Sequence, residues 1–435
     1  MTKSKITLDY FCLKGPYRLA FGYLLVFSIA FIFPIILANV YYWDDLGRSL
    51  YGYTEWTKNG RPLASLIGIL LSNSHIIIDT SPFIQLVSIC ILSYVLILFA
   101  KKYIPSQSPL VISGIVAFCY VNLNILQNLS FKYDCLGMIL SLSLPVALYA
   151  LPDEMSTLWA IVLSSLTCIG ILSLYQASLG AYIGLAVIEV TELLIHQKNI
   201  REITFRIGLR ILSLLIGCGI YKEIIVSLTV SQTGYAQKHA AVINFFASNG
   251  LSLLQHNILN FIQLLKLYAV TLGPVLLTCL IISAGAGLVM ISKRSWISSD
   301  SMAIKNFGAV LYILISPVLV FFATFISMCF LQSPVMDCRV MLSFSVFTLY
   351  IGLILQYAAS RIHNFFYVVS FFSLLVTLSF SSAYGNILYR EELYTRQIAQ
   401  HIVFDIDSIE HNAKKSYDKI SIAGKSPVCH EYELI

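Results

Sequence analysis

Long uninterrupted runs of apolar residues follow one another along the whole chain, separated by short polar stretches. Runs of about 20 residues are long enough to cross a hydrocarbon layer of roughly 30 Å as helices. Backbone polar groups inside a membrane must be satisfied within a helix or a closed barrel, and the runs here are continuous rather than alternating. The pattern therefore predicts an all-α polytopic membrane protein with about eleven transmembrane helices.

The predicted spans are residues 17–39, 80–100, 108–122, 136–151, 157–174, 179–195, 207–229, 260–290, 306–330, 340–359 and 365–383. The run 260–290 is too long for one perpendicular helix and contains Lys266 and a Gly273-Pro274 break, so a tilted helix or an interfacial start is expected there. The first loop, 41–79, contains Trp and Tyr and an apolar segment too short to span, which favours helices lying in the interface.

The distribution of charge sets the orientation of these spans. Only 11% of residues are charged and 58% are hydrophobic, and the net charge of +6 comes from short loops rather than from one dense patch, which excludes a nucleic-acid partner. Lys and Arg are retained on the cytoplasmic side, and they recur at alternate turnarounds, as at Lys101 with Lys102 and at Lys293 with Arg294. We therefore expect a cytoplasmic N-terminus, a transmembrane domain over 1–383, and a helical exterior tail over 384–435.

The spacing of the cysteines and histidines does not indicate a metal site or a particular disulfide. The ten cysteines show no CxxC spacing, and whether the exterior Cys338 and Cys429 pair is left open by the sequence. The histidines are unclustered, so no dedicated metal site and no required cofactor are expected, although Asp44 with Asp45 could hold Mg²⁺ or Mn²⁺. No Walker, GxGxxG or GxSxG motif occurs, which argues against ATP-driven transport and nicotinamide chemistry.

Acidic residues stand at two exterior mouths of the predicted bundle. Asp44 and Asp45 follow the first span, where a carboxylate can act as general base on an acceptor hydroxyl; the alternative is that one of them caps a helix starting near Leu46. Asp134 enters the fourth span, where an ionisable group is a functional candidate, or else forms a surface pair with Lys132 or a helix cap.

Several Lys and Arg residues fall on the predicted exterior side, although such residues are usually retained on the cytoplasmic side. One explanation is that they bind an anionic partner such as phosphate; the other is that they form salt bridges or extend to lipid phosphate. The corner Tyr175-Gln176 suits either sugar hydroxyls or interhelical hydrogen bonds. The candidate substrate-binding residues are Arg48, Arg61, Lys132, Asp134, Tyr175, Gln176, Lys238 and Arg339, with Trp43 and Trp56 for sugar stacking or membrane anchoring.

Five stretches of the sequence carry a family resemblance. The segment from Asn39 to Arg48, reading NVYYWDDLGR, followed by NGRPL at 59–63, resembles the Gtr family of O-antigen serotype-converting glucosyltransferases, which are often phage-encoded. The likeness continues at LQNLSFKYD (126–134), YQAS (175–178) and YGN (384–386), and so covers most of the chain.

The resemblance implies a C-type glycosyltransferase (GT-C) fold in the bacterial inner membrane. It implies transfer of a hexose, with glucose expected from the family, from an undecaprenyl (polyprenyl) phosphate donor to the lipid-linked O-antigen of lipopolysaccharide on the periplasmic side. An acid of the first exterior loop, here Asp44 or Asp45, would serve as base, and direct displacement would invert the anomeric centre.

Three other functions fit a polytopic chain. An O-antigen polymerase would concentrate its function in a large mid-chain exterior loop, whereas the first loop is richest here. A lipid-linked sugar flippase or transporter would usually show internal repeats, and we find none. A purely structural membrane protein does not explain the exterior cations together with the Asp pair.

Overall fold

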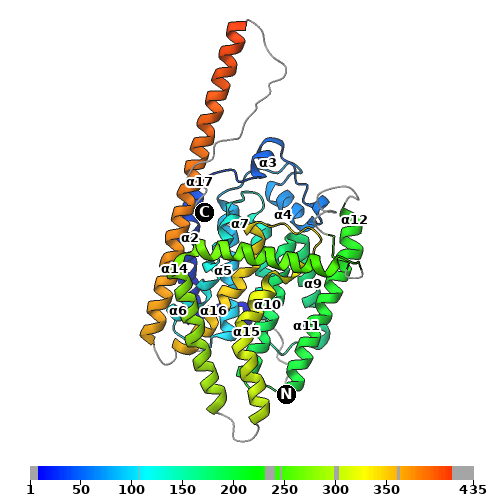
Figure 1. The fold of residues 1–435 in the computed structure, drawn as a ribbon, viewed down its shortest axis with the longest axis vertical. Helices are drawn as coiled ribbons and strands as arrows, with labels where there is room; N and C mark the ends of the chain where they lie inside the picture. Colours follow the sequence, from blue (N-terminus) through cyan, green and yellow to red (C-terminus); the bar gives the residue numbers. More distant parts are fainter. Residues whose placement is uncertain are drawn as a thin grey trace.

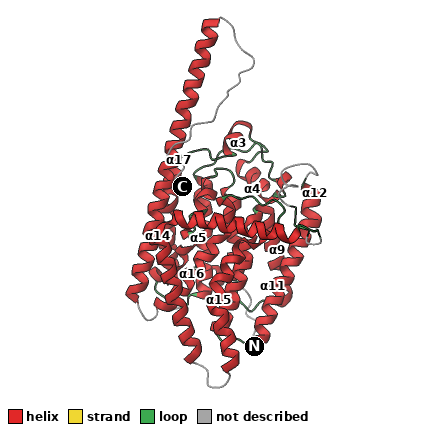
Figure 2. Ribbon diagram, viewed as in Figure 1, coloured by secondary structure: helices red, strands yellow, loops and turns green. Residues whose placement is uncertain are grey.

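The structure, a computed structural model, describes residues 8–105, 107–230, 241–244, 247–297, 303–359 and 363–413. Within these residues every regular element is a helix, and the one extended feature is an isolated bridge between Val242 and Leu331 (Figure 2). The predicted all-α polytopic architecture is confirmed.

Eight helical segments in the described part of the chain are long and apolar enough to cross a membrane. They are α2 (Pro16–Ala38), α5 (Phe83–Tyr103), α9 (Thr157–Leu174), η3 with α10 (Gln176–Ile195), α11 to α12 (Ile200–Thr229), α15 (Ala303–Cys329), η5 with α16 (Cys338–Tyr357) and α17 (His363–Ala413). Shorter apolar helices coincide with the remaining predicted spans: α6 with η2 (Pro109–Val121), α8 (Cys135–Ala150) and the second half of α14 (Gly273–Val289).

Helix α14 (Gly250–Ile297) is two helices joined at a break. Gly273 has φ 71° and ψ 164°, and Pro274 follows it without a backbone N–H to continue the helix. The half before the break lies across the bundle, and the half after it runs along the bundle (Figure 1). A single span over 260–290 is therefore not formed: residues 260–272 belong to the transverse helix, which agrees with the expected interfacial start rather than with one tilted helix. Because that helix does not cross, the alternation of the later spans is unchanged.

A stripe of side chains fixes the transverse half of α14 to α15. Asn257, Phe261 and Leu265 are buried at intervals of four residues. The Asn257 Nδ2 donates to the carbonyls of Cys329 at 3.0 Å and Leu331 at 2.7 Å, and the Phe261 ring stacks on Phe325 with 5.8 Å between centroids. The helix is thus held as part of the protein and not only by lipid.

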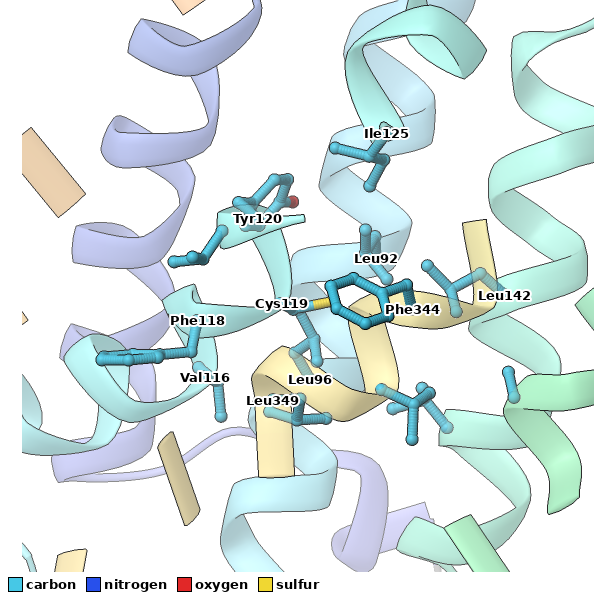
Figure 3. Packing of buried hydrophobic residues seen from close by; sticks show 14 of the residues in the cluster. Leu92, Leu96, Val116, Phe118, Cys119, Tyr120, Ile125, Leu142, Phe344 and Leu349 are labelled. Carbon is cyan, nitrogen blue, oxygen red and sulfur yellow. The ribbon is translucent and has the colours of Figure 1, made fainter. Parts of the chain in front are cut away.

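The core lies where α5, α6, α8 and α16 meet. Leu92 and Leu96 of α5 pack with Phe118 and Cys119 of η2 and with Leu349 of α16 (Figure 3). A Cβ on Gly352 of α16 would lie 2.5 Å from the Ile115 carbonyl oxygen, so glycine there lets two helices approach closely.

The two ends of the bundle differ in character. Figure 1 places α3, α4 and α7 at one end, with α17 projecting beyond them. Lys102 and Arg206, which belong to two turnarounds predicted to be cytoplasmic, both pair with Asp153, at 3.0 and 3.2 Å. These ion pairs hold the two turnarounds together. Helix α17 runs without a break past residue 384, so the predicted tail begins as the continuation of the last span; residues 414–435, including Cys429, lie outside the described residues.

Candidate active site

Three segments far apart in sequence lie beside the first loop. The loop contains α3 (Asp45–Tyr51), η1 (Thr57–Asn59) and α4 (Pro62–Ser72), which agrees with the expected helices in this loop. Beside it lie α7 (Ile125–Ser130) with the residues that follow it, η3 (Gln176–Ser178) and η5 (Cys338–Ser343). Hydrogen bonds, ion pairs and ring contacts between these segments bring most of the predicted site residues together.

Asp44 and Asp45 are adjacent in sequence but face different surroundings. Trp43 has φ 48°, a left-handed conformation that is rare for a bulky residue, and the chain turns there. The Asp45 carboxylate is fully buried, and its Oδ2 accepts from the backbone N–H of Lys132 at 2.7 Å and of Tyr42 at 3.4 Å. The Asp44 side chain is 57% exposed and makes no capping hydrogen bond, although Asp44 occupies the N-cap position of α3. Asp44 is thus the carboxylate that a substrate can reach.

Arg48 lies between two carboxylates. Its Nη1 is 3.8 Å from Asp44 Oδ2 and 3.6 Å from Asp134 Oδ2, distances that give charge attraction without a hydrogen bond. Its guanidinium lies 4.6 Å from the Trp56 ring centroid and 5.6 Å from that of Tyr53. The buried Nε and Nη1 have no hydrogen-bond partner among the described residues.

Burial and charge shift the pKa values of the two inner carboxyls. Burial raises the pKa of Asp45 to about 7, against the two backbone N–H groups and the Arg48 charge, which lower it. Burial also raises the pKa of Asp134, and three arginines, Arg48, Arg61 and Arg339, oppose that rise. Asp134 therefore lies within the electrostatic reach of all three guanidinium groups.

Arg61 and Arg339 flank Tyr175. The Arg61 Nε donates to Gln176 Oε1 at 2.6 Å, and its guanidinium lies 4.8 Å from the Tyr175 ring centroid. The Tyr175 hydroxyl donates to the Arg339 carbonyl at 3.2 Å. The Arg339 side chain pairs with Asp337 at 3.2 Å and lies 5.8 Å from the Trp43 ring centroid.

Lys132, by contrast, is held within the protein. Its ammonium donates to Asn39 Oδ1 at 2.7 Å and to Asp79 Oδ2 at 3.3 Å, and lies 4.2 Å from the Tyr41 ring centroid. These contacts tie the end of the first span to the end of the first loop. The paired ammonium favours a structural role over the phosphate contact suggested by sequence.

Other candidates differ in how accessible they are. Trp43 is 62% exposed, whereas Trp56 is buried beneath Arg48, so only Trp43 presents a free ring face. Lys238 lies outside the described residues. No group of three or more His, Cys, Asp or Glu side chains suited to a metal occurs in the part of the chain that was searched, and a cation at Asp44 and Asp45 stays a prediction.

Sequence reasoning missed three residues of this region. Asp79 pairs with Lys132, Asn128 Nδ2 donates to the Arg339 carbonyl at 3.1 Å, and the Tyr221 hydroxyl donates to the Gly60 carbonyl at 2.8 Å. Asn128 lies inside a stretch that carries the family resemblance, which is a usable signal. Tyr221 lies in an apolar span, and nothing in its local sequence indicates the contact.

Comparison with known proteins places these residues in a family context. The family described as Glucosyl transferase GtrII matches residues 33–350, which include the first loop and every segment beside it. An uncharacterized 55.3 kDa protein encoded in the gtrB 5′ region of Salmonella phage P22 is 28% identical over 249 residues, covering 57% of this chain. That match spans 50% of the phage protein's own length. No solved structure matches the chain significantly.

Proposed function

The chain belongs to the GtrII glucosyl transferase family, and on that premise we propose that it transfers glucose from a polyprenyl phosphate to lipid-linked O-antigen. The reaction takes place at the end of the bundle that holds the first loop, which is the periplasmic side of the bacterial inner membrane. The N-terminus is then cytoplasmic, in agreement with the basic turnarounds at the other end. The chemical steps below follow from the side chains available there.

One observation carries this proposal: an exposed carboxylate and a group of arginines lie together at the end of a membrane bundle. Asp44 is exposed beside Arg48, and Arg61 and Arg339 lie near Asp134. A base and a phosphate-binding group are what transfer from a lipid phosphate requires. A lipid-anchored donor also explains why the site lies at a membrane surface.

The reaction is a single displacement at the anomeric carbon. The Asp44 carboxylate takes the proton of the acceptor hydroxyl, whose oxygen forms the new bond to the anomeric carbon. The bond from that carbon to the phosphate oxygen breaks, and its electron pair leaves with the polyprenyl phosphate. Attack from the face opposite the leaving group inverts the anomeric configuration.

Arg61 and Arg339 stabilise the phosphate as its negative charge grows. The guanidinium fork matches phosphate oxygens, and both side chains keep donor groups beyond the contacts described above. Arg48 lies between the Asp44 and Asp134 carboxyl groups, 3.8 and 3.6 Å from them. Trp43, with its exposed ring, offers a stacking face for the sugar.

The test is transfer of labelled glucose by the purified full chain in lipid nanodiscs. Polyprenyl phosphate glucose and UDP-glucose are compared as donors, with lipid-linked O-antigen as acceptor, and the anomeric configuration of the product is read by NMR. The proposal expects transfer from the lipid donor alone, with inversion. Transfer from UDP-glucose, retention of configuration, or polymerisation of the acceptor in place of glucosylation would each contradict it.

A further inference from the structure

Helix α11 (Ile200–Ile220) ends in a turn of π-helix, η4, formed by Tyr221–Val226. A π turn contains one more residue than an α turn, so side chains before and after it differ in direction by about 100° from a regular helix. Such turns occur frequently at functional sites. Here the turn stands where α11 reaches the first loop.

Tyr221 is the residue of this turn whose side chain reaches the first loop. Lys222 and Glu223 are more than three-quarters exposed and lie 3.7 Å from each other, and Ile224 is half exposed. The Tyr221 hydroxyl instead donates to the Gly60 carbonyl at 2.8 Å. Gly60 has φ 75°, and a Cβ on it would lie 2.5 Å from that hydroxyl, so glycine leaves room for the contact.

Gln176 links Tyr221 to Arg61. The Gln176 amide nitrogen donates to the Tyr221 hydroxyl at 3.1 Å and to the Asn59 carbonyl at 2.9 Å. Its amide oxygen accepts from Arg61 Nε at 2.6 Å. Both amide hydrogens and the amide oxygen are therefore used, which fixes which way the amide faces. If the amide turned over, Arg61 Nε would face an NH₂ group and lose its acceptor.

We propose that Tyr221 is a positioning residue that, through Gln176, fixes the Arg61 guanidinium where it meets the phosphate of the lipid donor. The role depends on the proposed use of Arg61 as a phosphate ligand in glucosyl transfer. Tyr221 does not itself touch the substrate. The Tyr221 hydroxyl fixes the Gln176 amide, and the amide oxygen fixes Arg61 Nε by accepting its hydrogen bond. The two terminal nitrogens of Arg61 are then directed at the donor phosphate.

The experiment is a double-variant cycle in the full chain with polyprenyl phosphate glucose as donor. Tyr221→Phe lowers kcat/KM for the donor about tenfold, the size of one hydrogen bond to a group that orients a charge, and leaves the acceptor KM unchanged. Arg61→Ala lowers kcat/KM for the donor further, and adding Tyr221→Phe to Arg61→Ala has no additional effect on it. Tyr389→Phe on exposed α17 is the matched control and leaves transfer unchanged.

Apparent melting temperatures of the purified variants separate misfolding from misplacement. If Tyr221→Phe does not fold, Gln176→Leu breaks the next link by removing the acceptor of Arg61 Nε; its effect on kcat/KM for the donor is then expected to vanish in the Arg61→Ala background, and an additive effect overturns the relay. Effects of Tyr221→Phe and Arg61→Ala that multiply, or a change confined to the acceptor KM, overturn the role of Tyr221. A wild type that transfers nothing from polyprenyl phosphate glucose instead refutes the proposed function, so the two failures are distinguishable.

Discussion

Replacing Asp44 and Asp45 one at a time separates the base from its neighbour. Asp44 is exposed, and its nearest cation in the described region is Arg48 at 3.8 Å. An ion pair of this kind contributes about 0 to 1 kcal/mol, so Asp44→Asn leaves the melting temperature nearly unchanged. Loss of a general base costs roughly 10²- to 10⁴-fold in rate. Asp44→Asn is therefore expected to be folded and inactive.

Asp45 is expected to behave in the opposite way. Its buried carboxylate accepts the backbone N–H of Lys132 at 2.7 Å, and Asp45→Ala removes that acceptor. A buried donor left unsatisfied costs about 1 to 3 kcal/mol, out of the roughly 5 to 15 kcal/mol that holds a typical domain folded. Asp45→Asn keeps an acceptor oxygen and is expected to retain most of the stability and the activity.

The assay combines transfer per mole of folded protein with thermal unfolding, for wild type, Asp44→Asn, Asp45→Asn and Asp45→Ala at matched expression. The reasoning is refuted if Asp45→Asn is stable but inactive, because the buried carboxylate would then be the base. It is refuted equally if Asp44→Asn retains near wild-type transfer.

Three further predictions follow from other contacts. Burial raises the pKa of Asp45 to about 7, so the folded state favours its neutral form. The contribution of Asp45 to stability therefore falls as pH rises toward 7. In melting scans between pH 5 and 8, the melting temperature should decrease less for Asp45→Asn than for wild type. Arg339→Ala should lower kcat/KM for the lipid donor by about 10- to 100-fold through loss of a charged phosphate contact, with the acceptor KM unchanged in steady-state assays. Arg210 pairs with Glu189 through two hydrogen bonds of 2.8 Å inside the bundle, and Arg210→Met should destabilise the protein by about 3 to 5 kcal/mol in denaturation while the remaining folded enzyme stays active.

The membrane architecture could be predicted from hydropathy because the bilayer imposes it. A backbone in hydrocarbon has to form helices of a certain length, so runs of apolar residues translate almost directly into α2, α5 and α9. The break at Gly273-Pro274 was visible for the same local reason. The sequence left two alternatives for the helix before the break, a tilted span or an interfacial start, because the choice depends on the packing of Asn257 and Phe261 against α15.

The composition of the site could be predicted from sequence, but its geometry could not. Cations on the predicted exterior side and acids at span ends stand out by type and position alone. Which of two adjacent aspartates faces outward depends on the left-handed conformation at Trp43, and no composition signal predicts that. The pairing of Lys132 with Asp79 and Asn39, which favours a structural role, has no signal in the sequence around Lys132. These are long-range contacts, which a single sequence does not encode locally.

Arg61 and Arg210 are held in different ways. Arg210 makes two hydrogen bonds of 2.8 Å to the Glu189 carboxylate, which neutralise its charge, and its guanidinium lies 4.3 Å from the Tyr149 ring centroid. Arg61 also lies over a ring, that of Tyr175, but its Nε donates to the neutral Gln176 amide, and no ion pair of Arg61 occurs among the described residues. An aromatic face attracts the cation without using its N–H donors. This difference supports the proposed role of Arg61 as a phosphate ligand, because a carboxylate already in the guanidinium fork would compete with the phosphate for the same donors.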